Sequence, residues 1–169
     1  MKYFFTVLIG ISLASAASSQ SNKDSLLREL SGILEKAAGA AWKDQSLTKT
    51  IVKQTLSGNT ITLVLKEKGY FLDEAIDRTI TTTYRFVWDS LKKISTQLPD
   101  NPFVLSGCSE ADNYCQYQLN FPDRQVSRSR DNGKSETTNW FYVYMRPADK
   151  DRYFTCLQKL YAVLHPGKK

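Results

Sequence analysis

The spacing of apolar residues changes twice along this chain, and the two changes constrain the fold. Between residues 22 and 38 apolar side chains recur at every third or fourth position, as on one face of a helix. From Leu47 they recur at every second position, as in half-buried strands, and after Pro147 the helical spacing returns and continues to Leu164. This order predicts an α+β fold: an N-terminal amphipathic helix, a curved antiparallel sheet or partly open barrel of about six or seven strands, and a C-terminal capping helix.

The predicted strands are separated by short turns rich in Gly, Asn and Asp. Ser57-Gly58-Asn59 joins the first two strands and Asn132-Gly133 joins the last two, because Asn and Gly tolerate a positive φ. A break is expected at Gly69, followed by a polar segment over 73–77. The strands are predicted over residues 47–56, 60–66, 78–88, 89–98, 114–121, 125–130 and 136–146.

Both predicted helices begin with capping signals. Ser21, with Asp24 three residues later, predicts an N-terminal cap for the first helix. Pro147 stands where the second helix would start, and Asp149 and Asp151 occupy its first turn, where acidic groups meet the positive end of the helix dipole. The first helix is amphipathic, so it must dock its apolar face on another element.

The first residues have the pattern of a secretory signal peptide. Met1-Lys2 supplies a positive start, residues 3–13 an apolar run, and Ala14-Ser15-Ala16 a small-residue cleavage pattern. The run is shorter than the roughly 20 residues of a membrane-spanning helix, and no Cys follows it to carry a lipid. We therefore expect residues 1–16 to be removed and residues 17–169 to form a single domain, secreted or periplasmic and without a stable membrane span; an uncleaved anchor is the alternative.

Three cysteines allow at most one internal disulfide. Cys108 and Cys115 flank a polar, loop-like segment, and in an oxidising compartment they are the expected pair. Cys156 falls on the apolar stripe of the C-terminal helix, where a small buried hydrophobe is expected. The one histidine, His165, lies in the tail, so a metal site is disfavoured and no cofactor is expected.

The formal net charge of +6 is spread along the chain. The one dense basic cluster consists of Arg124, Arg128, Arg130 and Lys134, interleaved with acidic residues around a turn. We interpret this cluster as a solvated hairpin tip and not as a nucleic-acid patch, and export also argues against nucleic acid as a partner.

The last predicted strand leads directly into the last helix. Phe141-Tyr142-Val143-Tyr144-Met145 is followed by Ala148-Asp149-Lys150-Asp151-Arg152-Tyr153 and then by Leu157, Leu160 and Leu164. This arrangement resembles the end of a pleckstrin-homology-like domain, in which a final strand leads into a helix that plugs one end of a curved barrel. The resemblance concerns topology over residues 47–164 and leaves the helix over 22–38 outside the family's core. A cystatin-like or NTF2-like cone is the competing architecture.

Many members of that superfamily bind phosphoinositides through basic residues of the first hairpin, which the resemblance would place at Lys53, Lys66 and Lys68. Glu67 interrupts these lysines, the family's Arg-bearing pattern is not reproduced, and secretion disfavours a cytosolic lipid. We interpret the lysines as solvated guards of a strand edge, which prevent strand-to-strand aggregation.

Few residues of the sequence are candidates for enzyme catalysis. A Ser-His-acid triad would depend on His165, beyond the last helical turn, and Gly-rich phosphate-binding motifs do not occur. Asp73, Glu74 and Asp77 could act as paired carboxylates in a small secreted hydrolase, although such a run is typical of a solvated loop. A non-enzymatic binding or interaction module, for a protein or a small ligand, is therefore the leading prediction.

The binding face is predicted on the last strand, whose alternate side chains point to opposite faces. One face carries Trp140, Tyr142 and Tyr144, and the other carries Phe141, Val143 and Met145. The first three are the predicted ligand or partner surface, because aromatic side chains are common at interfaces. The alternative is that the N-terminal helix lies over them, since large uncovered apolar patches are rare.

Overall fold

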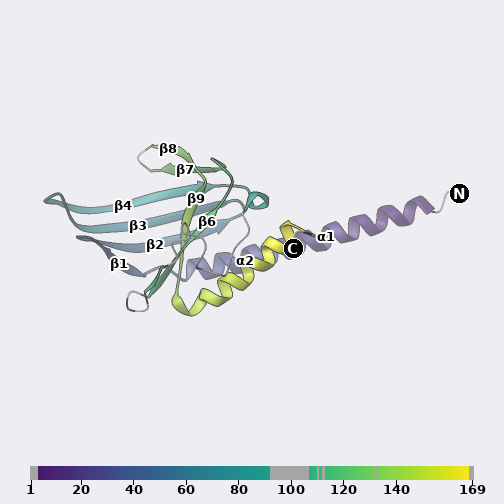
Figure 1. Cartoon of the computed structure of the whole chain (residues 1–169), viewed down its shortest axis with the longest axis horizontal. Helices are drawn as coiled ribbons and strands as arrows, with labels where there is room; N and C mark the ends of the chain where they lie inside the picture. Colours follow the sequence, from purple (N-terminus) through teal and green to yellow (C-terminus); the bar gives the residue numbers. More distant parts are fainter. Residues whose placement is uncertain (1–3, 92–106, 110, 112, 132, 168–169) are drawn as a thin grey trace.

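The computed structural model of the chain describes residues 4–91, 107–109, 111, 113–131 and 133–167, with side chains from residue 20 onward (Figure 1). The elements are α1 (Phe4–Glu35), β1 (Ala41–Asp44), β2 (Leu47–Ser57), β3 (Thr60–Phe71), β4 (Glu74–Arg85), η1 (Trp88–Ser90), β5 (Gly107–Ser109), β6 (Tyr114–Asn120), β7 (Val126–Arg130), β8 (Ser135–Thr138), β9 (Trp140–Met145), η2 (Pro147–Asp149) and α2 (Lys150–Leu164). The predicted α+β class, with a helix before and after the antiparallel strands, is confirmed.

The strands form two antiparallel sheets. The larger sheet has the strand order β1-β2-β3-β4-β7-β8, and the smaller has the order β5-β6-β9. Figure 1 shows β6 and β9 crossing the long strands β2 to β4 near the end where the helices lie, so that the long strands extend beyond the small sheet. Neither sheet closes into a barrel within the described residues, which contain nine strands where about six or seven were expected.

The hairpin of β3 and β4 is longer than the periodicity predicts. Pairing continues to Phe71 and Glu74, so the expected break at Gly69 is wrong and most of the expected polar segment belongs to β4. The chain reverses at Leu72 and Asp73, whose φ values are 48° and 66°.

Gly69 has a different role inside β3. Its φ is +146°, and a Cβ at this position would lie 2.1 Å from the carbonyl oxygen of Ser46, in the turn between β1 and β2. That oxygen also accepts the Tyr70 N–H at 3.3 Å, and the Ser46 hydroxyl donates to the Tyr70 carbonyl. The glycine therefore marks a close approach of two backbones, which the sequence pattern does not distinguish from a turn.

The two strands predicted on either side of Trp88 differ from the structure. The strand predicted over 78–88 ends at Arg85, and Trp88 begins the 3-10 helix η1. Trp88 is buried, and its indole N–H donates to the Gly58 carbonyl at 2.9 Å. The strand predicted over 89–98 is wrong at its start, and its residues from 92 onward lie outside the described part of the chain.

The strand predicted over 136–146 is two strands in different sheets. β8 ends at Thr138 beside β7, whereas β9 begins at Trp140 and pairs with β6. Asn139 lies at the crossing, where its carbonyl accepts the Phe121 N–H at 2.8 Å. Only Asn139 separates the two strands, so the sequence predicts them as one continuous strand.

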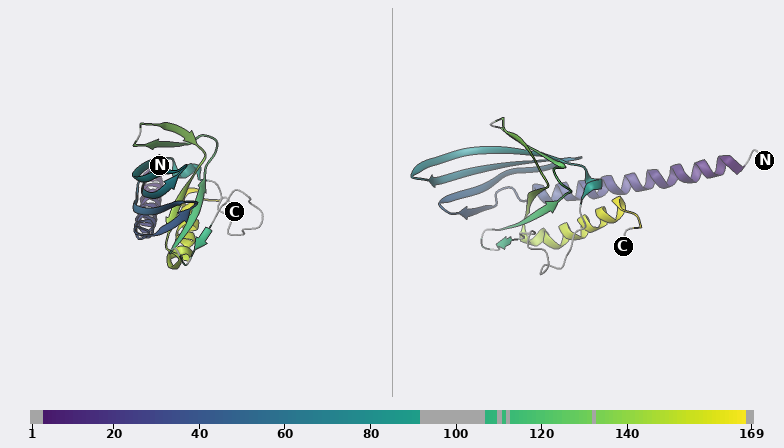
Figure 2. Two further views of the ribbon diagram at one scale, coloured as in Figure 1. Left: turned by 90° about the vertical axis from the view of Figure 1, so that its left-hand side faces the viewer. Right: turned by 45° about the horizontal axis from the view of Figure 1, so that its top comes forward.

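The two helices pack against each other through the predicted apolar stripes. Their buried side chains are Leu30, Ile33 and Leu34 of α1 and Tyr153, Cys156, Leu157 and Leu160 of α2. The start of α2 after Pro147 agrees with the prediction, but α1 is continuous from Phe4, so Ser21 lies inside the helix and is not its N-cap. Figures 1 and 2 show that the N-terminal half of α1 extends away from the rest of the molecule.

Buried side chains form two clusters on opposite faces of β9. The larger cluster joins both helices to the odd-numbered residues of β6 and β9, with the ring of Phe141 stacked on Tyr84 of β4 at 5.0 Å. The smaller consists of Ala37, Ala40, Trp42, Ile51, Leu63 and Tyr144. Side-chain alternation along β9 therefore divides the core in two.

Gln54 connects the two sheets and α1. A bulge in β2 between Ile51 and Lys53 turns Gln54 to the inner face, where only 1% of its surface is exposed. Its amide nitrogen donates to the Tyr144 carbonyl at 2.7 Å and to the Leu34 carbonyl at 3.1 Å, and its amide oxygen accepts the Tyr144 N–H at 3.0 Å. One side chain thus pairs with the backbone of β9 as a neighbouring strand would.

We expect Gln54→Ala to destabilise the fold by about 2–4 kcal/mol, because it leaves the N–H and C=O of Tyr144 buried without partners. Urea unfolding measures the free energy of unfolding. Gln116→Ala, which removes a half-exposed amide from β6, is the control and should cost less than about 1 kcal/mol. Equal losses for the two variants would contradict the role assigned to Gln54.

Gly69→Ala should destabilise the protein by more than about 2 kcal/mol, since the added methyl meets the Ser46 carbonyl. Gly32→Ala is the matched control. A Cβ at Gly32 meets nothing within 4 Å, and the alanine should stabilise α1 by about 0.5–1 kcal/mol. The thermal unfolding midpoint should fall for Gly69→Ala and rise for Gly32→Ala. An unchanged midpoint for Gly69→Ala would show that the backbones of Gly69 and Ser46 can move apart at no cost.

Candidate functional site

The structure places the three predicted binding residues on one face of β9, but not in equal surroundings. Tyr144 is 6% exposed, whereas Trp140 and Tyr142 are half-buried, with their rings 5.0 Å apart. The opposite face of the strand, with Phe141, Val143 and Met145, is fully buried in the larger cluster. One face of β9 is therefore core, and the other is open along part of its length.

Tyr144 is covered mainly by other aromatic rings. The Trp42 ring of β1 stacks on it at 5.1 Å, and the Tyr114 ring lies 6.4 Å away. Ala37 and Ala40, which follow α1, reach the same cluster. Trp140 and Tyr142 are half-buried, and the alternative that the N-terminal helix lies over all three aromatics stays a prediction. Burial raises the pKa of the Tyr144 phenol, so it remains a protonated hydrogen-bond donor.

Three amide side chains lie directly opposite these aromatics. The register of β6 and β9 pairs Gln116 with Tyr144, Gln118 with Tyr142, and Asn120 with Trp140. Directly opposed residues share a face, so the six side chains form one surface, which we call the aromatic–amide face. Within it, the Gln118 amide donates to the Asn120 side-chain oxygen at 2.7 Å. Alternation predicted the polar side of β6, but only the register shows its aromatic partners.

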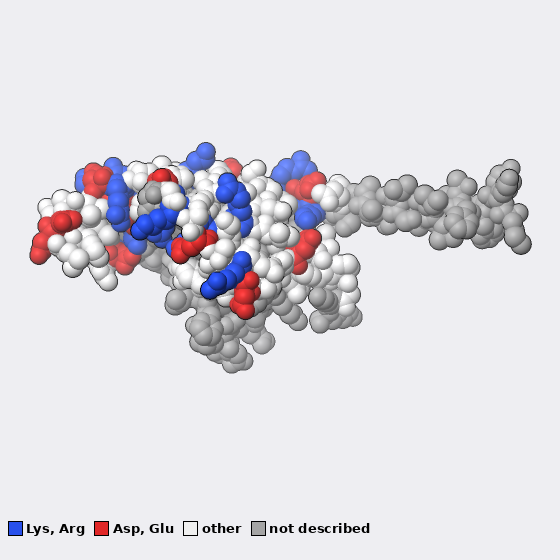
Figure 3. Space-filling view, turned by 90° about the horizontal axis from the view of Figure 1, so that it is seen from above, with Lys and Arg blue, Asp and Glu red and all other residues white. Residues whose placement is uncertain are grey.

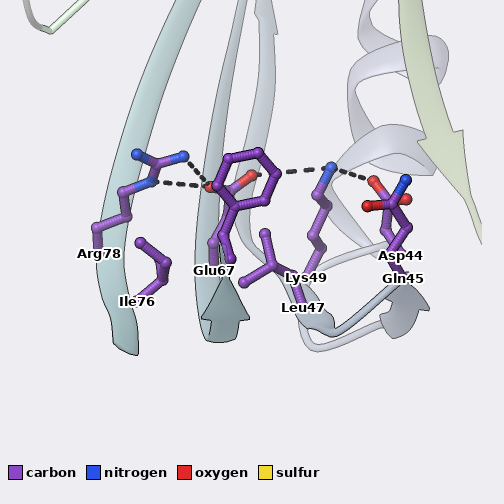
Figure 4. Close-up of a pocket in the computed structure, with 8 residues that line it drawn as sticks. Asp44, Gln45, Leu47, Lys49, Glu67, Ile76 and Arg78 are labelled. Atoms are coloured by element: carbon purple, nitrogen blue, oxygen red, sulfur yellow. Dashed lines mark hydrogen bonds and ion pairs between the residues drawn. The ribbon is translucent and has the colours of Figure 1, made fainter. Parts of the chain in front are cut away.

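A row of charged side chains crosses the inner face of the large sheet beside this surface (Figure 4). Its members are Asp44, Lys49, Glu67 and Arg78, one from each of β1 to β4. Trp42, Lys49, Glu67 and Arg78 are successive partners in the register, so this charge row lies on the face that Trp42 presents to Tyr144. The charge row and the aromatic–amide face therefore adjoin at Trp42.

Glu67 is the buried centre of the charge row, with 7% of its surface exposed. Its Oε2 accepts from Arg78 Nη2 at 2.7 Å and from Arg78 Nε at 2.9 Å, and its Oε1 lies 3.8 Å from Lys49 Nζ. Lys49 also pairs with Asp44. The row thus contains two carboxylates and two cations and carries no net charge.

The charge row borders a hollow of about 390 Å³ at the free end of the long strands. Its lining residues are Asp44, Gln45, Leu47, Lys49, Glu67, Phe71, Ile76 and Arg78. Figure 4 shows Leu47 and Ile76 beside the row of ion pairs. The hollow thus combines an apolar floor with basic and acidic groups.

The carboxylates proposed for hydrolysis do not converge. Asp73 lies in the β3–β4 turn, while Glu74 and Asp77 are three residues apart on β4 and so point to opposite faces. All three are exposed, and Asp77 pairs with Lys66 at 3.4 Å. The arrangement does not form a carboxylate dyad.

The lysines interpreted as edge guards are all exposed, but they differ in their strand neighbours. Lys66 and Lys68 belong to β3, which pairs with β2 on one side and β4 on the other at these positions, so their assignment to a strand edge is wrong. Lys53 belongs to β2 and pairs with Val64 of β3, whereas the pairing of β2 with β1 ends at Thr50.

The cysteines behave as the sequence predicts. Cys108 and Cys115 form a disulfide between the paired strands β5 and β6. Cys156 is a free, buried thiol whose Sγ donates to the Leu26 carbonyl at 3.3 Å. Burial raises its pKa to about 11, which keeps it protonated and unreactive near neutral pH.

The basic cluster around β7 and β8 is interleaved with acids. Arg128 pairs with Glu136, and the Asp131 carboxylate accepts the Thr81 N–H at 2.8 Å. Figure 3, which views the molecule from above, shows acidic and basic side chains interspersed and no large patch of one sign. This distribution is typical of a solvated surface.

Across the described residues, no group of three His, Cys, Asp or Glu side chains is placed to hold a metal ion. No helix in this part of the chain combines the length and hydropathy that a bilayer crossing requires.

Comparison with known proteins returns no family model, no curated protein and no solved structure that matches this chain. The resemblance to pleckstrin-homology-like domains therefore stays a prediction.

Proposed function

We propose that this protein is a secreted, non-enzymatic binding module and that the aromatic–amide face is its ligand surface. The observation that carries the proposal is the register of β6 and β9, which sets three amides opposite three aromatic rings on the side of the small sheet away from the helices. Trp140 and Tyr142 are half-buried and keep part of their surface accessible, with Gln118 and Asn120 beside them. Such a surface costs folding stability to leave open, which supports a role in binding.

A saccharide is the ligand class that suits these groups best. The flat rings of Trp140 and Tyr142 offer an apolar surface for the C–H face of a sugar ring. Gln118 and Asn120 each offer both a donor and an acceptor, which matches hydroxyl groups that donate and accept. The strands hold these side chains in place before binding, so little conformational entropy is lost.

The charge row extends the surface toward the free end of the long strands. The Arg78 side chain is 57% exposed although it is bonded to Glu67, so its remaining N–H groups can reach a ligand. A ligand that contacts both Trp140 and Arg78 would be longer than one ring. The site therefore favours an oligosaccharide over a single sugar.

A hydrolase has less support from the same residues. Asp73 lies in the β3–β4 turn, Glu74 and Asp77 point to opposite faces of β4, and both carboxylate oxygens of Glu67 are engaged by Arg78 and Lys49. Neither arrangement supplies a proton donor near the aromatic–amide face. Binding without chemistry is the simpler account of the described residues.

Secretion rests on the signal-peptide pattern of residues 1–16 and agrees with the Cys108–Cys115 disulfide. We expect N-terminal sequencing of the exported protein to begin at Ala17. Among the α1 side chains that the structure describes, from residue 20 onward, the buried ones begin at Leu30, with Leu26 and Leu27 partly buried, so these packing residues all lie beyond the expected cleavage site. An exported chain that retains Met1 would contradict the expectation and favour an uncleaved anchor.

The proposed ligand surface is tested by screening the protein on a glycan array and then measuring the affinity of the strongest ligand by calorimetry. Trp140→Ala and Tyr142→Ala should each weaken saccharide binding by about tenfold or more, because loss of a stacking ring removes about 1–3 kcal/mol of binding free energy. Tyr70→Ala, which removes an exposed ring on a different part of the molecule, is the control and should bind normally. Absence of saccharide binding, or equal binding by all three variants, would overturn the proposal.

A further inference from the structure

The β7–β8 hairpin and the loop before it carry more basic than acidic residues. The charged residues of this segment, 122–138, are Arg124, Arg128, Arg130 and Lys134 against Asp123, Asp131 and Glu136. Arg128 pairs with Glu136, and the Asp131 carboxylate accepts the Thr81 N–H. The Arg130 side chain is exposed and forms no ion pair with any residue that the structure describes. Its guanidinium is therefore available to a ligand.

The register of the large sheet places Arg130 on the face against which β9 lies. Gln54, Leu63, Thr82 and Arg130 are successive partners across β2, β3, β4 and β7. Directly opposed residues share a face, so Arg130 lies on the same face as Gln54. Because the Gln54 amide bonds to the backbone of Tyr144, this is the face that β9 crosses. Figure 1 shows β9 crossing the large sheet from the β7–β8 side to the β1 side.

Arg130 also lies on the side of β9 that the aromatic–amide face presents. Trp140 begins β9 beside β8, where its N–H bonds to the Thr138 hydroxyl at 3.4 Å. Thr138 pairs with Val126 of β7, which is buried in the larger cluster on the helix side of β9. Arg130 is four residues farther along β7, about 13 Å toward the free ends of the long strands. A ligand stacked on Trp140 would thus have Arg130 on its other side.

We propose that the saccharide bound at the aromatic–amide face is acidic, and that Arg130 binds its carboxylate or sulfate group. The inference rests on the proposed saccharide binding and specifies the charge of the ligand. A guanidinium presents its N–H donors in a planar fork that matches two oxygens of such a group. A neutral sugar offers single hydroxyl groups, for which the amides of Gln118 and Asn120 already supply donors and acceptors.

The charges around the aromatic–amide face permit an anionic ligand. The charge row has no net charge, and its buried carboxylate, Glu67, is engaged by Arg78 and Lys49. Glu74 shares the inner face of β4 with Thr82 but lies eight residues away, or about 26 Å. At that distance water and salt screen its repulsion of an anion near Arg130. The chain as a whole carries a formal net charge of +6, which favours the approach of an anion.

A glycan array that carries acidic glycans beside their neutral counterparts tests the proposal on the full exported chain. The strongest ligands should contain uronate or sulfate groups. Calorimetry then compares each of them with its methyl-esterified or desulfated form, which distinguishes a carboxylate from a sulfate as the recognised group. The acidic form should bind about tenfold or more tightly, because hydrogen bonds between ionised groups are stronger than neutral ones. Added salt should reduce this difference.

Two variants with the same change of charge make the test specific. Arg130→Gln should bind the acidic and neutral forms about equally, with its affinity for the neutral form unchanged. Arg85→Gln, which removes an exposed arginine from the opposite face of the same sheet, should keep the full preference. Neutral glycans as the strongest ligands, or a preference that persists in Arg130→Gln, would overturn this inference and leave saccharide binding in place. Absence of binding to every glycan would overturn both.

Discussion

The contact between the Gln54 amide and the Tyr144 backbone determines how the two sheets meet. A strand edge left unpaired inside a protein is costly, and here one side chain provides both the donor and the acceptor that β9 needs. The same amide holds the last turns of α1 through the Leu34 carbonyl. Because this contact sets the position of β9, it also sets which aromatics are buried and which form the open part of the aromatic–amide face.

Much of the secondary structure follows from the periodicity of the sequence. The helical stripes, the hairpin at Gly58, the strand over 114–121 and the cysteine pair agree with their predictions. The errors arise where two structures share one pattern. A glycine can mark a turn or a close backbone approach, as at Gly69, and an extended run with no Gly or Pro can belong to one strand or to two, as at Asn139. Such cases are decided by contacts between distant residues, which no local pattern contains.

The candidate site was predictable only in part, for a related reason. Alternation placed Trp140, Tyr142 and Tyr144 on one face, but their unequal burial depends on Trp42 and Tyr114, which come from other strands. The amides of β6 and the charge row become visible only once the register is known. Glu67 reads as an interruption among lysines in the sequence, whereas in the fold it is a buried carboxylate between Lys49 and Arg78.

The three tryptophans occupy three unlike surroundings. Trp88 is buried with its indole N–H donating to a carbonyl, Trp42 stacks on Tyr144 between the sheets, and Trp140 is half-buried beside Tyr142. Indole emission depends on the polarity around the ring, so the intrinsic fluorescence of this protein is a sum of three distinct contributions. The chain thereby carries separate optical reporters for its core, for the contact between its sheets and for its open surface.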